Sequence, residues 1–392
     1  MEWVINPKEY DLRIPIKSWC EAVEAGAMKQ AFNLAKLPYA FHHISLMPDT
    51  HLGYGMPIGG VMATKDVIVP NAVGYDINCG MRAIRTDFFA DSMILTPEII
   101  KIILGKIREV IPVGDKSHKE KQESTLFDNA PDIPIIQQQL QRVKYQIGTL
   151  GSGNHFIELQ KDSALGNLWI MLHSGSRNFG YRIAKQYYNK AKVLSERYFS
   201  DLPDQELSFL SMQEKVGNEY FEAMNYAGEF AKLNRKSMML KIIDIVKEVL
   251  NAKILEEIDV RHNYARIENH YGKDVFVHRK GAINARKNVV GIIPGSQGTN
   301  SYITKGLGNA DSFESSSHGA GRILGRNQAR KVLKLKEQIK KLNDKGVIHS
   351  IRNQEDLDEA PGAYKNIEDV MKSQEDLCKI IFTLKPLGVV KA

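Results

Sequence analysis

The sequence has few cysteines, no long apolar run and no fixed-period repeat. Its three cysteines, Cys20, Cys79 and Cys378, are too few and too scattered for a disulfide framework. No stretch approaches the roughly 18 uninterrupted apolar residues of a membrane-spanning helix, so we expect no membrane partner. The first residues also lack the basic and then apolar layout of a signal peptide. These absences predict a cytoplasmic protein, in which a cysteine serves as a metal ligand, a nucleophile or a small core residue.

The composition is that of a globular protein. The chain has 392 residues, of which 43% are apolar and 25% are charged, so disordered, collagen-like and coiled-coil classes are excluded. Its 53 lysines and arginines outnumber 46 aspartates and glutamates, which gives a net charge of +7. This mild excess permits a polyanionic partner such as nucleic acid, but does not require one.

Glycine-rich turns cluster in three separated blocks, over residues 53–80, 148–180 and 291–321. Short apolar runs around these turns predict strands. Helically spaced apolar residues predict helices over 18–37 with Ser18 as N-cap, 96–110, 181–253 with a break near 201–204, and about 322–342. The polar segment 115–134 predicts a mobile loop or linker. Because the chemically interesting residues do not segregate into two halves, we expect one α/β (α+β) domain over residues 1–392, with the three blocks meeting at one cleft.

Several polar residues have the spacing of metal ligands. Asp76 and Cys79 lie three residues apart in a glycine-bounded turn, although a turn-capping aspartate and a buried cysteine would look the same. His155 follows a glycine turn, and His173 ends an apolar strand. For His155 an ordinary structural role is about equally plausible from the sequence, and for His173 a satisfied core histidine is the slightly favoured interpretation. His262 is a further candidate ligand.

These five side chains offer too many donors for one tetrahedral structural zinc and too few thiolates for a zinc ribbon. They suit two neighbouring ions, with the thiolate shared between them and coordination positions left open. The softness of the Cys79 ligand alone favours zinc.

Other side chains suit anions or group transfer. His318, between Ser317 and Gly319, is sterically open, so it could bind a metal, move a proton or act as a nucleophile. The guanidinium of Arg177 suits a phosphate, although a surface arginine is the simpler interpretation. Asp49 and His51 have ligand-like spacing, yet they could equally cap turns and line the cleft.

At this point the chain resembles the RtcB family of RNA-splicing ligases. The matching segments occur in the family's order and span residues 47–391: MPDTHLGYGMPIGGV (47–61), VGYDINCGMR (73–82), GTLGSGNHFIEL (148–159), LHSGSRNFG (172–180), HNYA (262–265), VHRKGA (277–282), PGSQGTNSY (294–302), SSSHGAGR (315–322), EAPGAYK (359–365) and PLGVVK (386–391).

The resemblance implies a ligase that joins an RNA 3′-phosphate or 2′,3′-cyclic phosphate end to a 5′-hydroxyl end, with GTP as cofactor. It implies a central β-sandwich-like core. It also implies that His318 is the nucleophile that takes GMP, and that two manganese ions are held by Asp76, Cys79, His155, His173 and His262. Zinc or cobalt are alternative ions.

The resemblance further implies a set of guanine-nucleotide contacts. These are Asn154, His155, Phe156, Ile157, Glu158, His262, Asn263, Pro294, Gly295, Ser296, Gln297, Ser301, His318, Gly319, Ala320, Gly321, Tyr364 and Lys391. For RNA phosphates, the basic residues Arg177, Lys280 and Arg322 are the candidates. An archease-type activating partner is a further expectation. The rival functions are a two-metal phosphoesterase that only opens the cyclic phosphate, and a non-catalytic RNA-binding protein.

Overall fold

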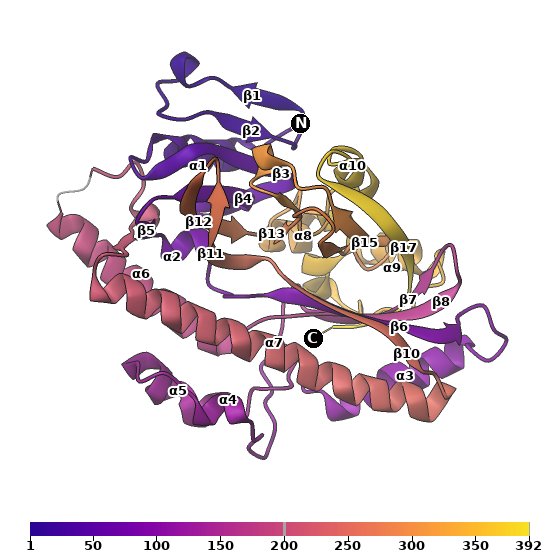
Figure 1. Cartoon of the computed structure of the whole chain (residues 1–392). Coiled ribbons are helices and arrows are strands. Elements are labelled where there is room, and N and C mark those ends of the chain that lie inside the picture. The colour runs from indigo at the N-terminus through magenta and orange to yellow at the C-terminus, as the bar shows by residue number, and fades with distance from the viewer. Residues whose placement is uncertain (199–200, 392) are drawn as a thin grey trace.

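Two β-sheets form the core of the computed structural model, which describes residues 1–198 and 201–391 (Figure 1). The fold is mixed α/β, as the sequence predicts. One sheet has the order β1(Trp3–Ile5), β2(Ile16–Ser18), β3(Ala40–Tyr54), β4(Met56–Thr64), β12(Lys273–Lys280), β11(Asn263–His270). The other has the order β10(Ile254–Arg261), β6(Gly80–Phe89), β8(Asn167–Ser174), β7(Phe156–Asp162), β17(Cys378–Val390), β15(Ser301–Gly306), β14(Val290–Ile293). Two short pairs join β5(Val67–Ile68) to β9(Leu210–Ser211) and β13(Ala282–Asn284) to β16(Ser315–Ser317).

The seven-stranded sheet is curled until its two edge strands, β10 and β14, contact each other. Its neighbouring strands are all antiparallel, and side chains alternate between the two faces of each strand. Met81, Trp169 and Ile303 pack together in the curled interior. Ile84 and Ile170 point to the opposite face and pack beneath helices. With apolar contacts on both faces, this nearly closed sheet gives the turns at its ends a rigid frame.

Helices α3 (Pro97–Val110) and α7 (Lys215–Leu250) cover the outer face of this sheet. Figure 1 shows α7 running along the lower side of the molecule, with α6 (Arg177–Arg197) before it. The predicted helix 96–110 and the predicted long, interrupted helical region are therefore confirmed. The remaining α-helices are α1(Ala25–Lys36), α2(Pro70–Val73), α4(Thr125–Asp128), α5(Pro134–Val143), α8(Arg326–Val332), α9(Leu335–Asn343) and α10(Ile367–Lys372). No helix in the described part of the chain is both long and apolar enough to cross a membrane.

Three local predictions were wrong. Ser18 does not cap a helix: it ends β2, where pairing with β3 replaces helical hydrogen bonds, and α1 begins only at Ala25. The helix predicted over 322–342 is two helices, because Leu333 and Lys334 are extended between α8 and α9. The segment 115–134 contains the short helix α4, which is capped by the side chain of Ser124.

Candidate functional site

Four of the predicted ligands arrive at one end of four neighbouring strands, β10, β6, β8 and β7. Cys79 directly precedes β6, which pairs with the end of β8 that carries His173. His155 directly precedes β7, whose Phe156 pairs with His173. His262 follows β10, and its backbone N–H donates to the carbonyl of Cys79 at 2.9 Å. The antiparallel register therefore brings together residues that are far apart in the sequence.

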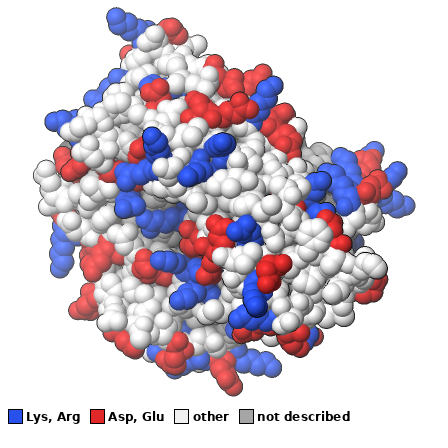
Figure 2. All heavy atoms as spheres, turned by 45° about the vertical axis from the view of Figure 1, so that its right-hand side comes forward, with Lys and Arg blue, Asp and Glu red and all other residues white. Residues whose placement is uncertain are grey.

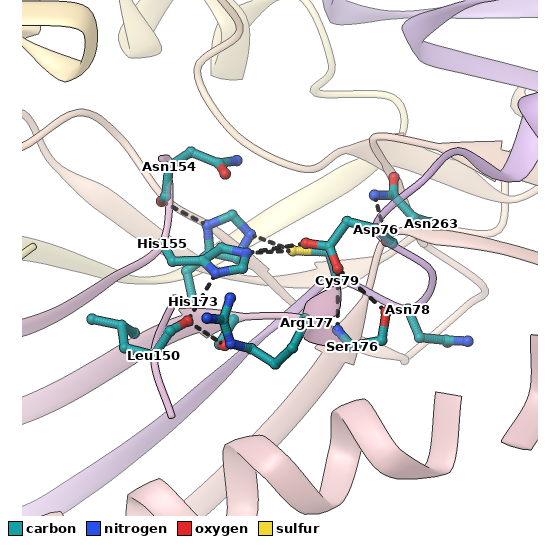
Figure 3. Close-up of polar contacts among 12 residues, drawn as sticks. Asp76, Asn78, Cys79, Leu150, Asn154, His155, His173, Ser176, Arg177 and Asn263 are labelled. Atoms are coloured by element: carbon teal, nitrogen blue, oxygen red, sulfur yellow. Dashed lines mark hydrogen bonds and ion pairs between the residues drawn. The ribbon is translucent and has the colours of Figure 1, made fainter. Parts of the chain in front are cut away.

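These side chains and Asp76 form one cluster, in which Cys79 and the three histidines are buried and Asp76 is partly exposed. Figure 3 shows four of its members, Asp76, Cys79, His155 and His173. Sγ of Cys79 lies 3.2 Å from Nε2 of His173 and 3.4 Å from Nε2 of His155. On one side, Oδ2 of Asp76 lies 3.1 Å from Nε2 of His155. On the other, Nε2 of His262 lies 3.3 Å from Nε2 of His173. Cys79 is thus shared between two pairs of potential ligands, which is the arrangement that two ions with a common thiolate require.

Hydrogen bonds at Nδ1 set the tautomer of two histidines in the cluster. Nδ1 of His155 lies 2.9 Å from the carbonyl oxygen of Leu150, and Nδ1 of His173 lies 3.1 Å from that of Asn154. A carbonyl only accepts, so each Nδ1 carries the proton and each Nε2 presents a lone pair to Cys79. Burial lowers the pKa of His173 and His262 well below the usual histidine value, which keeps both rings neutral.

The Cys79 sulfur and the histidine nitrogens that face it are suited to bind a cation. Burial and the carboxylate of Asp76 raise the pKa of Cys79 well above its usual value. A neutral thiol can donate to only one of the two nitrogens that face it, so a second lone pair remains without a proton. A metal ion satisfies these lone pairs together and stabilises the thiolate, as coordinating cations do. The residues present therefore fit a metal centre.

A small residue next to the cluster keeps room for the aspartate. Burial alone would raise the pKa of Asp76, but hydrogen bonding and charge from His155 bring it down to about 2. The backbone N–H of Ser176 donates to Oδ1 of the same carboxylate at 3.1 Å. A Cβ atom on Gly175 would lie 2.2 Å from that oxygen. Glycine is required here because any side chain would displace the carboxylate.

His318 lies beside this cluster, with its ring centre 4.8 Å from that of His262. Both its backbone N–H and its Nδ1 donate to Oδ2 of Asp49, at 3.1 and 2.6 Å. The carboxylate fixes the proton on Nδ1 and leaves Nε2 as the free nucleophilic nitrogen. Asp49 therefore orients His318. The sequence singled out Asp49 but left open whether it is a ligand or lines the cleft.

His318 also lines a cavity of about 780 Å³ that receives residues from all three glycine-rich blocks. Thirteen of the predicted nucleotide contacts line it: Asn154, Phe156, Glu158, Pro294, Gly295, Ser296, Gln297, His318, Gly319, Ala320, Gly321, Tyr364 and Lys391. Five others lie behind its wall. His155 and His262 belong to the ligand cluster, Ile157 packs in the core, Asn263 donates to the carbonyl of Asp76, and Ser301 accepts from Gln160. His51, Tyr54, Arg326 and Glu359 line the cavity as well, without having been predicted as nucleotide contacts.

A family model described as tRNA-splicing ligase RtcB matches residues 30–392. The chain belongs to the RtcB family. It is 37% identical to the RNA-splicing ligase RtcB of Escherichia coli K12, over 96% of this chain and 97% of that protein. It is 32% identical to the tRNA-splicing ligase RtcB of Nanoarchaeum equitans, over 99% and 97% of the two chains. It is 31% identical to the tRNA-splicing ligase RtcB of Thermococcus kodakarensis, over 100% of this chain and 97% of that protein. The resemblance inferred from the motifs is confirmed.

In this RtcB-family chain, Glu359 organises the far wall of the cavity. Its carboxylate accepts from Lys391 at 3.1 Å, from Arg322 at 2.9 Å and from the hydroxyl of Tyr364. Burial would raise the pKa of Glu359, but the positive charges of Lys391, Arg322 and Arg326 lower it to about 2. Arg322, a predicted RNA contact, is therefore held inside the cavity wall by a protein carboxylate.

The other two predicted RNA contacts also have protein partners. Arg177 donates to the carbonyl of Gly114 at 2.9 Å and to the hydroxyl of Thr149 at 3.1 Å. Nζ of the buried Lys280 donates to the carbonyl oxygens of Tyr54 and Asn71, at 2.6 and 2.9 Å. Both side chains support backbone near the RtcB-family site, and their contact with RNA remains a prediction.

A second group of potential ligands, Glu268, His270 and Glu314, does not suit a metal ion. Arg279 donates to both carboxylate oxygens of Glu268, at 2.6 and 3.0 Å. Arg286 donates to Glu314 at 2.7 Å. These guanidinium groups already neutralise the carboxylates, so this group is a buried ion-pair network of the RtcB-family fold.

Proposed function

We propose that this protein is a GTP- and Mn²⁺-dependent RNA ligase that joins a 3′-phosphate or 2′,3′-cyclic phosphate end to a 5′-hydroxyl end. One observation carries the proposal: His318, held at Nδ1 by Asp49, lines the cavity beside a cluster of metal-ligand side chains. The names of the relatives, RNA-splicing ligase and tRNA-splicing ligase, support RNA as the substrate. Splicing and repair of broken RNA are the processes that need this chemistry.

In the first step, the neutral Nε2 of His318 attacks the α-phosphorus of GTP. A P–N bond forms, the bond from the α-phosphorus to its bridging oxygen breaks, and pyrophosphate leaves. Asp49 retains the proton on Nδ1 and stabilises the positive charge that develops on the ring. Asp76, Cys79, His155, His173 and His262 would hold the two ions, which when bound supply positive charge against the phosphates.

Two further transfers complete the reaction. An oxygen of the RNA 3′-phosphate attacks the phosphorus of GMP, the P–N bond breaks, and His318 is restored. The 5′-hydroxyl oxygen then attacks the RNA 3′-phosphorus, its proton leaves, and GMP departs as the new phosphodiester forms. A 2′,3′-cyclic end must first add water to become a 3′-phosphate. Dividing one difficult joining step into easier transfers is the advantage of a covalent intermediate.

The cavity suits a nucleotide in size and in polarity. Its volume of about 780 Å³ lies within the usual range for small-molecule sites. Glu158 offers a carboxyl group that can accept from the N–H groups of guanine once it is ionised. Lys391 offers a cation close to Glu158, and its Nζ donates to Glu359 at 3.1 Å.

To test the proposal, the protein is incubated with Mn²⁺ and with GTP labelled at the α-phosphate. RNA with a 3′-phosphate end and a 5′-hydroxyl end is then added. We expect label on the wild-type protein and on the joined RNA intermediate. His318→Ala should lose both, because the imidazole that takes up GMP is removed. His349→Ala is the matched control, since His349 lies outside the cavity beside Asn343.

The same experiment separates the rival functions. A two-metal phosphoesterase needs no nucleotide-bearing histidine, so it would open a cyclic phosphate equally well after His318→Ala. Ligation that survives in this variant would refute the proposal. A non-catalytic RNA-binding protein is disfavoured, because all five ligands and the Asp49–His318 pair are present in the described chain.

A further inference from the structure

Three tyrosine rings from distant segments form a continuous line beside the metal-ligand cluster. Tyr54 ends β3, Tyr75 directly precedes the ligand Asp76, and Tyr181 lies in the first turns of α6. The ring centres of Tyr54 and Tyr75 are 6.3 Å apart, and those of Tyr75 and Tyr181 are 5.4 Å apart. Tyr54 is 68% exposed and Tyr181 is 43% exposed, while Tyr75 between them is partly buried and packs against the core.

The two ends of the tyrosine line open into different hollows. Tyr54 lines the cavity that holds His318. Tyr181 lines a second, open groove of about 1140 Å³ between α5, α6 and α7. The line therefore connects the proposed nucleotide cavity to the groove and passes directly by Asp76.

The groove carries an excess of positive charge. One acidic residue, Glu219, lines the groove. Five basic residues line it as well: Arg182, Lys185, Lys190, Arg197 and Lys215. Lys190 pairs with Glu219 at 3.4 Å, while the other four form no ion pair within residues 1–198 and 201–391. Nζ of Lys185 also lies 5.8 Å from the ring centre of Tyr181. By contrast, Figure 2 shows basic and acidic side chains interspersed on the face that it presents.

The tyrosine line is held in place from behind. The buried Nζ of Lys280 binds the carbonyl oxygens of Tyr54 and Asn71. Asn71 belongs to α2, which ends at Val73, just before Tyr75. One buried lysine thus ties together the two backbone segments that carry the first two rings.

We propose that the tyrosine line and the basic groove bind a single-stranded segment of RNA that leads to one of the two ends being joined; this rests on the proposed function. Exposed aromatic faces interleaved with cations are the recurring means of binding single strands, because every base can stack and every phosphate is negative. A duplex offers no free base faces, so the surface selects unpaired ends. Its connection to the cavity places the end of such a strand at His318.

Binding of two short single-stranded RNAs of about 10 nucleotides tests this inference, one with a 3′-phosphate end and one with a 5′-hydroxyl end. Fluorescence polarisation gives the affinity of each without GTP. Tyr181→Leu keeps an apolar side chain but removes the ring. We expect it to weaken binding of at least one RNA by about 5- to 150-fold, the worth of one stacked base. Tyr181→Phe keeps the ring and should keep the affinity.

Charge and position are tested separately. Lys185→Ala should reduce the slope of log affinity against log salt by about 0.7, as expected for one phosphate contact to a single strand. Lys236→Ala, at an exposed position of α7 outside the groove, should leave the slope unchanged. Tyr10→Leu, 53% exposed near the N-terminus, is the matched aromatic control.

Wild-type ligation, measured in parallel, separates the two proposals. If the wild type joins RNA ends while Tyr181→Leu and Lys185→Ala bind both RNAs as tightly as the controls, the inference is overturned and the ligase function stands. Equal competition by a blunt duplex would also overturn it. If the wild type neither takes up GMP nor joins ends, the proposed function itself fails.

Discussion

Replacing Glu158 by glutamine should remove a pH-dependent loss of stability. Burial raises the pKa of Glu158 to about 8, against the lowering effects of Gln160 and Lys391. The unfolded chain has the ordinary value near 4.5, so between these values the folded protein holds one more proton than the unfolded one. Stability therefore falls as pH rises through this window. Between about pH 6 and pH 8, the linkage amounts to about 2 kcal/mol from this single group.

Urea denaturation measures this effect. The nucleotide-free wild type and Glu158→Gln are unfolded at several pH values, and unfolding is followed by tryptophan fluorescence. Other titrating groups are common to both proteins and cancel in the difference. We expect the stability advantage of the variant to grow by about 2 kcal/mol from pH 6 to pH 8. Parallel curves would refute the reasoning, since they would mean that Glu158 is ionised in the folded protein throughout.

The remaining predictions concern the ligand cluster, the nucleophile and the buried ion pair. Cys79→Ala should lose bound metal and ligation together, and unchanged metal content by elemental analysis would contradict a shared thiolate. Asp49→Asn should slow GMP attachment by about 10-fold while the metal content stays constant, because a charge-assisted hydrogen bond to His318 becomes a neutral one; wild-type rates would argue against this role. Glu268→Gln should destabilise the fold by about 3–5 kcal/mol, because the fully buried Arg279 loses its counter-charge. Urea denaturation at neutral pH measures this loss, and a variant as stable as the wild type would contradict the prediction.

The site was easier to predict than the surroundings of its basic residues. Cys79, His155 and His173 each lie beside a glycine-rich turn next to an apolar run, a local pattern that is visible in the sequence. Their convergence depends on the strand order β10-β6-β8-β7, which no local pattern encodes. The inference that the three blocks share one cleft came from the distribution of the motifs, and the structure bears it out.

Long-range contacts explain what the sequence could not specify. Asp49 meets His318 because β3 passes beside β16, and the two residues are 269 positions apart. Lys280 and Arg322 looked like phosphate contacts because of their charge. Burial determined their partners instead, with backbone carbonyls around Lys280 and a carboxylate at Arg322. Ser18 illustrates the same effect at the level of secondary structure, since sheet pairing overrode a local helix signal.

The pairing of β10 with β6 in the seven-stranded sheet couples cation affinity to the completion of folding. His262 follows one edge strand, β10, and reaches Cys79 only when β10 has docked against β6. An ion that needs all five ligands thus binds only the native state. Its binding free energy then adds to the stability of that state. Loading with a divalent ion should raise the melting temperature of the wild type, whereas His262→Ala, which removes the donor that follows β10, should show a smaller increase.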